Sequence, residues 1–358
     1  MKTDERLIFL LGANTPSGFV SKAGQLVTPQ SGLRSYILKG GPGTGKSTII
    51  RKVAQALEDQ PDLELIACAS DLESLDGVVT KKLCVLDGTR PHLIEPVYPG
   101  AVECVVDLTC ALDEGMLQAC RDEIVTLTQN VARCHEYCCR YLAAAAALQA
   151  DSYRLALDCL DTEKLTGYLN RLCDKLLRQK PGAPAGKEAS RFLTAVTSKG
   201  VVQLTGSAKK LARRIYLISD EQGALSRFML HHIRAVALER GHDVIACYCP
   251  LAPFDKLEQL FIPGLSLGFM TSNRFHNFEM EIEPYRVVSC ARFTKEGCLK
   301  GHKKRLAYNR KAAAQMINQA QGLLGEAHTL HGELESYYTA ATDFAKVDAI
   351  TQQLLSRL

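Results

Sequence analysis

The sequence lacks a large excess of charge of either sign. Its 43 lysine and arginine residues and 39 aspartate and glutamate residues give a formal net charge of +4, which is too small to argue for nucleic-acid binding. The most basic stretch, residues 295–311, contains one tyrosine, and we interpret it as a solvent-exposed or acid-paired helix face. Nucleic acid is therefore not an expected partner.

Long apolar runs are also missing. No window offers the ~18 uninterrupted apolar residues that a membrane span needs, so no membrane association is expected. The short apolar run near the N-terminus follows Asp4 and Glu5 and recurs later in the chain. We therefore assign it to a folded domain rather than to a signal peptide.

None of the 14 cysteines forms a C-x-x-C pair, which argues against a zinc ribbon or a thioredoxin-like motif. A secreted disulfide scaffold is usually shorter and denser in cysteine. Most of these cysteines lie in apolar runs, where we expect small core residues. The sequence therefore favours a reduced, cytoplasmic compartment.

What the sequence does contain is the composition of a globular protein. Hydrophobic residues make up 46% and charged residues 23%, values that exclude a mostly disordered chain. At ~100–200 residues per domain, the 358 residues predict about two domains.

The two parts of the chain repeat one another. The segment that begins at Ala13 matches the segment that begins at Ala195, Gly18 matches Gly200 at the same offset, and further matches follow in the same order. Between the repeats lies RQKPGAPAGKEAS, whose proline, glycine and alanine content is typical of a linker. We expect a first domain over 1–178, a linker over 179–189 and a second domain over 190–358.

Each repeat alternates short strands with helical segments. In the first, β-branched runs predict strands over 35–39, 63–69, 82–87 and 101–108, with a helix over 47–59. This alternation predicts a parallel sheet flanked by helices. The expected fold class is α/β, with two tandem P-loop NTPase-like domains, each ending in a long C-terminal helical arm.

The arms are predicted from apolar residues spaced alternately by three and four. One stripe runs from Leu117 to Cys159, and its counterpart runs from Leu299 to Ala341, a pattern typical of helices that pack along a stripe. Each arm packs either on its own domain or on the other arm as a pseudo-twofold pair. The acidic stretch 113–123 and the basic stretch 295–305 favour the pair, provided that the helix directions let them meet.

Residues 40–47, GGPGTGKS, match the Walker A pattern G-x-x-x-x-G-K-[ST] at every specified position. A predicted strand precedes the pattern and an amphipathic helix follows it. The amides of such a loop form an anion-binding nest, and the helix N-terminus adds partial positive charge. The residues expected to bind nucleotide are Gly40, Gly41, Pro42, Gly43, Thr44, Gly45, Lys46, Ser47 and Thr48.

Three residues have specific expected roles in this site. Lys46 is expected to reach the β- and γ-phosphates, and Ser47 to ligate Mg²⁺. Asp87 closes the apolar run KKLCVLD, so we take it as a Walker B magnesium ligand and, with Lys46, as a catalytic residue. The alternative for Asp87 is a turn-forming Asp-Gly pair. No glutamate follows Asp87, so the water-activating carboxylate of many ATPases is missing there.

Several neighbours of the loop carry polar groups. Asp71, Glu73 and Asp76 follow a predicted strand and either face the γ-phosphate or act as cap and turn residues. His92 follows the strand of Asp87, near the sheet edge where ligands bind. His276 is its counterpart in the second repeat, and a loop-stabilising role is the alternative for both.

The second repeat has lost the loop pattern. Pairing Tyr36 with Tyr216 exchanges Gly40 for Asp220, Gly41 for Glu221, Gly45 for Leu225 and Lys46 for Ser226. At the offset that relates Ala13 to Ala195, Asp87 aligns with Phe269. Two carboxylates at the loop mouth repel phosphate. We predict that the second repeat does not bind nucleotide in this manner.

The chain resembles an uncharacterised bacterial family of duplicated P-loop ATPase-like proteins over nearly its full length. The resemblance is carried by GANTPSGF, LKGGPGTGKST, CASDLESLDGVV, VLDGTRPH, EPVYPGAVE and the later TSNRFH. It implies tandem P-loop domains and ATP binding, and it assigns no substrate. Both loops can be intact in that family, so the loss of the second loop here puts two-site cooperation in doubt.

The sequence therefore predicts a Mg²⁺-dependent ATPase, or GTPase, with one nucleotide site per chain. The alternatives are a nucleotide or small-molecule kinase that uses the same loop, and a non-catalytic, nucleotide-dependent scaffold that binds a protein partner through the helical arms. An arginine of the second repeat, Arg227 or Arg274, is a candidate to complete the site.

Overall fold

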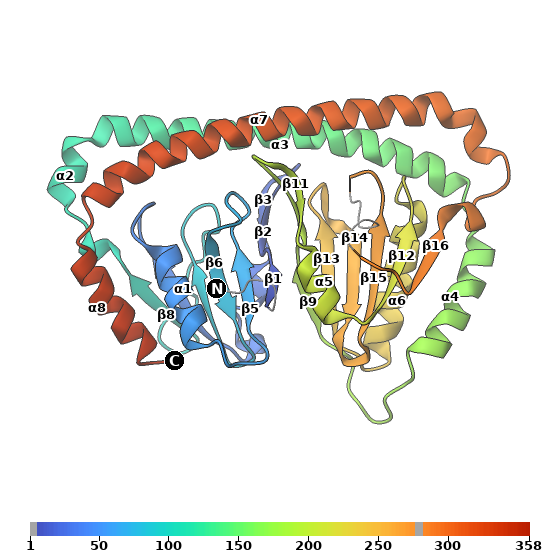
Figure 1. Ribbon diagram of the computed structural model, residues 1–358, viewed down its shortest axis with the longest axis horizontal. Coiled ribbons are helices and arrows are strands. Elements are labelled where there is room, and N and C mark those ends of the chain that lie inside the picture. The colour runs from blue at the N-terminus through green and yellow to red at the C-terminus, as the bar shows by residue number, and fades with distance from the viewer. Residues whose placement is uncertain (1–5, 276–281) are drawn as a thin grey trace. The chain divides into compact units, whose positions relative to one another are not determined.

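A computed structural model describes residues 6–275 and 282–358, and its architecture is α/β (Figure 1). Each sequence repeat builds one six-stranded sheet. The chain divides into two compact units. The first comprises Met1–Cys139, Val196–Gly200 and Ala320–Leu358, and the second comprises Arg140–Ala195 and Val201–Gln319. His276, predicted as the counterpart of His92, lies outside the described residues.

Both sheets have the same strand order. The first runs β1 (Leu7–Phe9), β5 (Glu64–Ala67), β6 (Leu75–Val79), β7 (Leu83–Asp87), β4 (Arg34–Lys39), β8 (Glu103–Asp107). The second runs β9 (Glu188–Arg191), β13 (Val244–Cys249), β14 (Ala252–Ile262), β15 (Leu267–Ser272), β12 (Arg214–Ser219), β16 (Arg286–Ser289). The repeat seen in the sequence thus extends to the topology.

Each repeat also forms a separate two-stranded hairpin. These hairpins consist of β2 (Gly12–Thr15) with β3 (Gly18–Ser21), and of β10 (Thr194–Thr197) with β11 (Gly200–Gln203).

The sheets are mixed rather than parallel throughout as predicted, because one strand in each sheet runs against its neighbours. Strand β6 pairs antiparallel with both β5 and β7, and β14 does the same in the second sheet. A parallel connection needs a crossover of a dozen or more residues. Only residues 68–74 separate β5 from β6, so the chain can only turn back. Sequence reasoning missed β6 because its Asp-Gly interrupts the apolar run.

The helix predicted over 47–59 is observed as α1 (Lys46–Ala56), which packs on β6 and β7. Its buried face presents Ile49, Ile50 and Val53 to the sheet. Helix α6 (Ala224–Glu239) occupies the same place on the second sheet, which α5 (Thr205–Leu211) also contacts. The glycine-rich loop therefore ends on a helix that the hydrophobic core holds firmly.

The predicted arms are two helices of 38 residues, α3 (Arg121–Asp158) and α7 (Lys303–Ala340). The first and last residues of α7 follow those of α3 by the same number of positions by which Ala195 follows Ala13. The remaining helices are α2 (Glu114–Ala119), α4 (Thr162–Leu176) and α8 (Phe344–Leu355).

The last helix of each repeat belongs to the unit built around the other repeat's sheet. Helix α8 packs beside α1, where Val347 and Leu354 join the core of the first unit (Figure 1). Helix α4 packs beside α6, where Leu165 and Leu169 join the core of the second unit. The sequence halves 1–178 and 190–358 therefore each contribute to both units.

The two long helices run antiparallel. In the first unit, the segment before the N-terminus of α3 lies beside the C-terminus of α7, where the Asp113 amide donates to the Ala341 carbonyl at 2.8 Å. In the second unit, a disulfide between Cys159 and Cys298 joins the C-terminal end of α3 to the segment before the N-terminus of α7. The acidic stretch 113–123 and the basic stretch 295–305 fall in different units.

The basic N-terminal end of α7 pairs with the C-terminal end of α3. Arg305 and Asn309 both hydrogen-bond to Asp151, with distances of 2.5 and 2.7 Å at their closest. The side-chain amide of Asn309 also donates to Ser152 Oγ at 3.2 Å. These contacts explain why the second apolar stripe tolerates a polar residue at Asn309.

The cysteines divide by burial. Six cysteines outside the disulfide are buried, as their apolar surroundings predict: Cys84, Cys134, Cys138, Cys173, Cys247 and Cys249. Among the described residues, none of the helices combines the length and apolarity needed to cross a bilayer. The cytoplasmic compartment remains a prediction, and the Cys159–Cys298 disulfide was not expected from it.

Candidate functional site

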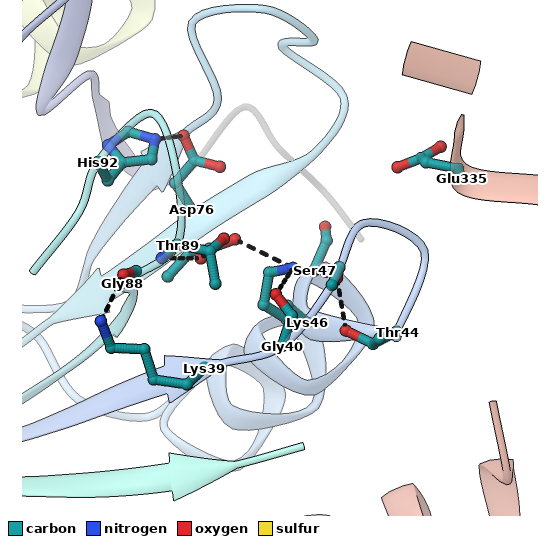
Figure 2. Close-up of polar contacts among 12 residues, drawn as sticks. Lys39, Gly40, Thr44, Lys46, Ser47, Asp76, Gly88, Thr89, His92 and Glu335 are labelled. Atoms are coloured by element: carbon teal, nitrogen blue, oxygen red, sulfur yellow. Dashed lines mark hydrogen bonds and ion pairs between the residues drawn. The ribbon is translucent and has the colours of Figure 1, made fainter. Parts of the chain in front are cut away.

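The candidate site is the glycine-rich loop between β4 and α1 (Figure 2). Gly45 has φ +84° and is the N-cap residue before α1, and no described side chain caps that helix start. The first amides of a helix lack partners within the helix, and together with the helix dipole they attract an anion. The loop therefore presents a positive end of α1 at the carboxyl end of β4, which lies between β7 and β8.

Lys46 lies folded over the loop. Its Nζ donates to the Gly41 carbonyl at 2.7 Å and to the Gly40 carbonyl at 3.4 Å, and the Lys46 side chain is only 10% exposed. The same Nζ lies 3.8 Å from Asp87 Oδ2. The structure thus brings together the two residues predicted to be catalytic.

Ser47 and Thr44 hold the loop to its surroundings. Ser47 Oγ accepts a hydrogen bond from the Leu75 amide of β6 at 3.0 Å. Thr44 Oγ1 donates to the Gly41 carbonyl at 2.8 Å. The predicted magnesium ligand Ser47 therefore lies on the first turn of α1, facing the antiparallel strand that sequence reasoning missed.

The two interpretations of Asp87 apply to different oxygens. Asp87 Oδ1 accepts hydrogen bonds from the Thr89 amide at 2.8 Å and from the Thr89 hydroxyl at 2.6 Å, which forms the turn after β7. Asp87 Oδ2 is the oxygen that faces Lys46. One carboxylate therefore both shapes the turn and presents a charge to the loop.

A second pair lies beside Asp87. His92 Nε2 is 2.8 Å from Asp76 Oδ2, and the side chains are only 8% and 12% exposed. The ring of Phe19, on the β2–β3 hairpin, packs edge-on against His92 at 5.0 Å. Burial lowers the pKa of His92, but the hydrogen bond and charge of Asp76, with the charge of Asp87, outweigh it and raise that pKa.

The other carboxylates of this segment behave as turn residues. Asp71 accepts from the Ser74 hydroxyl at 2.7 Å and from the Glu73 amide at 3.2 Å. The Glu73 side chain is exposed. Of the three acidic residues considered near the γ-phosphate, Asp76 alone pairs with a buried side chain beside Asp87.

The raised pKa of His92 predicts a pH-dependent stability. Because the pKa of His92 is higher in the folded than in the unfolded protein, protonated His92 stabilises the fold fully at pH values below its pKa in the unfolded chain, ~6.5. This stabilisation is lost as the pH rises through the pKa of His92 in the folded protein. We therefore expect His92→Gln to lose more unfolding free energy at pH 5.5 than at pH 9. Urea denaturation at both values measures this, and an equal loss at both would contradict it.

The corresponding loop of the second repeat holds an anion of its own. Asp220 is 1% exposed. Its carboxylate accepts from the Gly223 amide at 3.0 Å and from the Ser226 amide at 2.8 Å. Gly223 has φ +78° and is the N-cap residue before α6. The helix-start amides of the second loop are therefore taken by a carboxylate of the chain itself.

The structure corrects the alignment of the two loops. Gly45 and Gly223 both precede the helix with positive φ, so Gly223, and not Leu225, is the counterpart of Gly45. The second loop is shorter by two residues, which an ungapped alignment cannot show. Ala224, rather than Ser226, then stands where Lys46 stands in the first loop.

A lysine from another strand lies beside the second loop. A Cβ on Gly223 would be 3.6 Å from Lys256 Nζ, which pairs with the buried Glu258 at 2.5 Å. The strand register also places Thr271, and not Phe269, at the position of Asp87, because Ile218 pairs with Thr271 as Leu38 pairs with Asp87. In either alignment the second repeat has no carboxylate at the position of Asp87.

The C-terminal end of α7 contacts the first loop, and sequence reasoning missed it. A Cβ on Gly41 would lie 2.4 Å from the Tyr338 ring, and one on Gly43 would lie 2.8 Å from the Glu335 carbonyl oxygen. Thr339 Oγ1 donates to the Gly43 carbonyl at 3.4 Å. Glycine is therefore required at both positions for the helix to approach. The one sequence signal related to this contact is the repeat, which predicts that the arm α7 packs either on its own domain or on α3.

The two arginines considered for this site are engaged in the second unit. Arg227 pairs with Asp255, and its guanidinium lies 4.2 Å from the centre of the Tyr153 ring. Arg274 lies 3.7 Å from Glu221.

Comparison of the chain with models of protein families, with curated proteins and with solved structures gave no match in any of the three.

Proposed function

We propose that the first unit binds a nucleoside triphosphate with Mg²⁺ at the loop of residues 40–47, in the manner of a P-loop NTPase, and hydrolyses it. The observation that carries the proposal is the approach of Lys46 Nζ to Asp87 Oδ2, 3.8 Å apart above a helix start that no described side chain caps. A cation and a carboxylate at this place suit a phosphate chain and its metal ion.

The second loop supports the same proposal. There the helix-start amides hold the Asp220 carboxylate, so this loop geometry suits an anion. The first loop has Gly40 at the position of Asp220, and it therefore leaves its amides to an anion from solution. One nucleotide site per chain follows from this difference.

The residues present also fit a magnesium ion. Ser47 Oγ and Asp87 Oδ2 are hard oxygen donors near the loop, and Mg²⁺ in such sites takes one or two protein oxygens together with phosphate and water oxygens. The described residues contain no group of three or more histidine, cysteine or acidic side chains that could hold a metal ion, which agrees with a metal that arrives with the nucleotide. When bound, the ion would offset negative charge on the phosphates.

Phosphoryl transfer to a small-molecule acceptor is the second candidate, and the Asp76–His92 pair favours it. This pair is buried beside Asp87, where a carboxylate held by a histidine could receive the proton of an acceptor hydroxyl. The third candidate, a scaffold that binds a partner through α3 and α7, requires nucleotide binding without turnover.

Replacing Lys46 with alanine tests the central proposal. The variant loses the cation that pairs with the phosphates, so we expect the affinity for Mg-ATP or Mg-GTP to fall on the order of 100-fold. Calorimetric titration of both nucleotides measures this, with Lys52→Ala, on the same helix and ion-paired with Asp348, as the matched control.

The turnover assay separates the three candidates. Phosphate release from nucleotide alone supports hydrolysis, whereas ADP release that requires an added nucleoside or nucleoside monophosphate selects the kinase. Binding without turnover selects the scaffold. No binding of ATP or GTP by the unsubstituted protein at millimolar concentration would overturn the proposal.

A further inference from the structure

The end of α7 lies directly against the glycine-rich loop within the first unit. Thr339 Oγ1 donates to the Gly43 carbonyl, and the Tyr338 ring covers Gly41. The Glu335 carbonyl oxygen would be 2.8 Å from a Cβ on Gly43, which has φ +69°. One turn of α7 is therefore held at contact distance from the loop, next to the proposed phosphate site.

Glu335 is the acidic residue on this turn. In Figure 2 its carboxylate projects from α7 toward the side of the loop that carries Lys46 and Ser47. Its Oε1 lies 3.5 Å from His331 Nε2, one turn earlier, and its side chain is 47% exposed. The hydrogen bond from His331 lowers the pKa of Glu335, and the positive charge of Lys46 adds to this effect. Glu335 is thus an ionised, solvent-accessible carboxylate within the electrostatic reach of Lys46.

The other carboxylates at this edge have different partners. Asp87 is held by Thr89 and faces Lys46. Asp76 is held by His92. The position after Asp87, where many ATPases carry a water-activating glutamate, is Gly88. The site therefore has its metal-side carboxylate in place and lacks a water-activating one on the same strand.

The repeat shows that this glutamate accompanies the intact loop alone. At the offset that relates α7 to α3, which pairs Lys303 with Arg121, the counterpart of Glu335 is Tyr153. In the second unit Tyr153 packs on the guanidinium of Arg227, in the first turn of α6. The helix beside the loop that keeps its lysine thus carries a carboxylate, and the helix beside the loop that lost it carries a tyrosine.

We propose that Glu335 supplies the missing carboxylate and activates the attacking water during nucleotide hydrolysis. One carboxylate oxygen accepts a proton from water as the water oxygen bonds to the γ-phosphorus. The bond between that phosphorus and the β–γ bridging oxygen breaks, and its electron pair leaves with the nucleoside diphosphate. His331 is a positioning residue that orients Glu335. This inference rests on the nucleotide site proposed above, and it makes that site depend on both sequence repeats.

Glu335→Gln in the full-length protein tests the inference. Glutamine keeps the size of the side chain and cannot accept the proton, and general-base catalysis contributes ~10²–10⁴-fold to such reactions. We expect kcat to fall at least ~100-fold while the Kd for Mg-ATP changes less than ~3-fold. Single-turnover measurements should then show uncleaved ATP accumulating on the protein. Glu333→Gln, an exposed position two residues earlier on α7, is the matched control and should keep full activity.

Three results would overturn the inference: an unchanged kcat in Glu335→Gln, a loss of activity explained entirely by weaker ATP binding, or an equal loss of kcat in Glu333→Gln. Each of these leaves the proposed nucleotide site standing if Lys46→Ala still loses binding. Failure of the unsubstituted protein to bind nucleotide refutes the proposed function instead. Thermal melting of each variant separates misfolding from catalysis, and Glu335→Asp, which keeps the charge, should retain more activity than Glu335→Gln.

Discussion

Asp87→Asn is expected to lower Mg²⁺-dependent nucleotide turnover by about 100- to 1,000-fold, the scale of losing one preorganised electrostatic group. Asparagine keeps the Oδ1 acceptor for Thr89, so the turn after β7 survives. It removes the charge at Oδ2, which lies 3.8 Å from Lys46 Nζ and is placed to bind Mg²⁺. Turnover at a series of Mg²⁺ concentrations measures the effect, and the apparent Kd for Mg²⁺ should rise.

The chain contains a close control for this substitution. Asp107 ends β8 and forms the same turn, with hydrogen bonds from the Thr109 amide at 2.8 Å and from the Thr109 hydroxyl at 2.6 Å. Asp107→Asn should leave turnover within about twofold of the unsubstituted protein, because the exposed Asp107 side chain is held by Thr109, whereas Lys46 faces Asp87. Equal losses in Asp107→Asn and Asp87→Asn would assign Asp87 to the turn alone.

Asp220→Ala should cost the fold about 3–5 kcal/mol of unfolding free energy. The substitution removes a buried carboxylate that accepts two amide hydrogen bonds, each worth about 1.5–3 kcal/mol when one partner is charged. The charge balance around the buried Lys256 is disturbed as well, since Glu258 and Asp220 together raise the pKa of that lysine against the opposing effect of burial. At ~2–4 °C per kcal/mol for a unit of this size, the melting temperature should fall by roughly 6–20 °C.

Glu221→Ala, one residue along the same loop, is the control. Its side chain is 32% exposed and lies 3.7 Å from Arg274, a surface pair worth at most about 1 kcal/mol. A melting temperature of Asp220→Ala within ~2 °C of the control would show that the Asp220 carboxylate is not what holds the second loop.

The sequence was most informative where chemistry is local. The glycine-rich pattern identified the loop, the strand before it and α1 after it, because a tight phosphate-binding turn requires glycine and lysine at fixed spacing. The apolar stripe likewise predicted both long helices, since period alone determines which face is apolar. Asp87 was selected because it closes a strand and His92 because it follows that strand. The structure places Asp87 beside Lys46 of the loop and His92 near Asp87.

Sequence reasoning was weaker where a partner lies far along the chain. Strand β6 was missed and the sheets were expected to be parallel, because the direction of a strand follows from the length of its connection rather than from its own residues. The lost loop was aligned two residues out of step, since sequence letters do not show that Gly223 takes the φ of Gly45.

The sequence by itself determined that the chain contains two repeats of one fold and that only the first repeat keeps the lysine of the loop. Only the tertiary structure decided that the last helix of each repeat packs in the other repeat's unit, and that Glu335 of the second repeat lies against the glycine-rich loop of the first. The physical reason is that an apolar helix face specifies burial and not a partner. Which core it joins depends on the connections and on the packing of the whole chain.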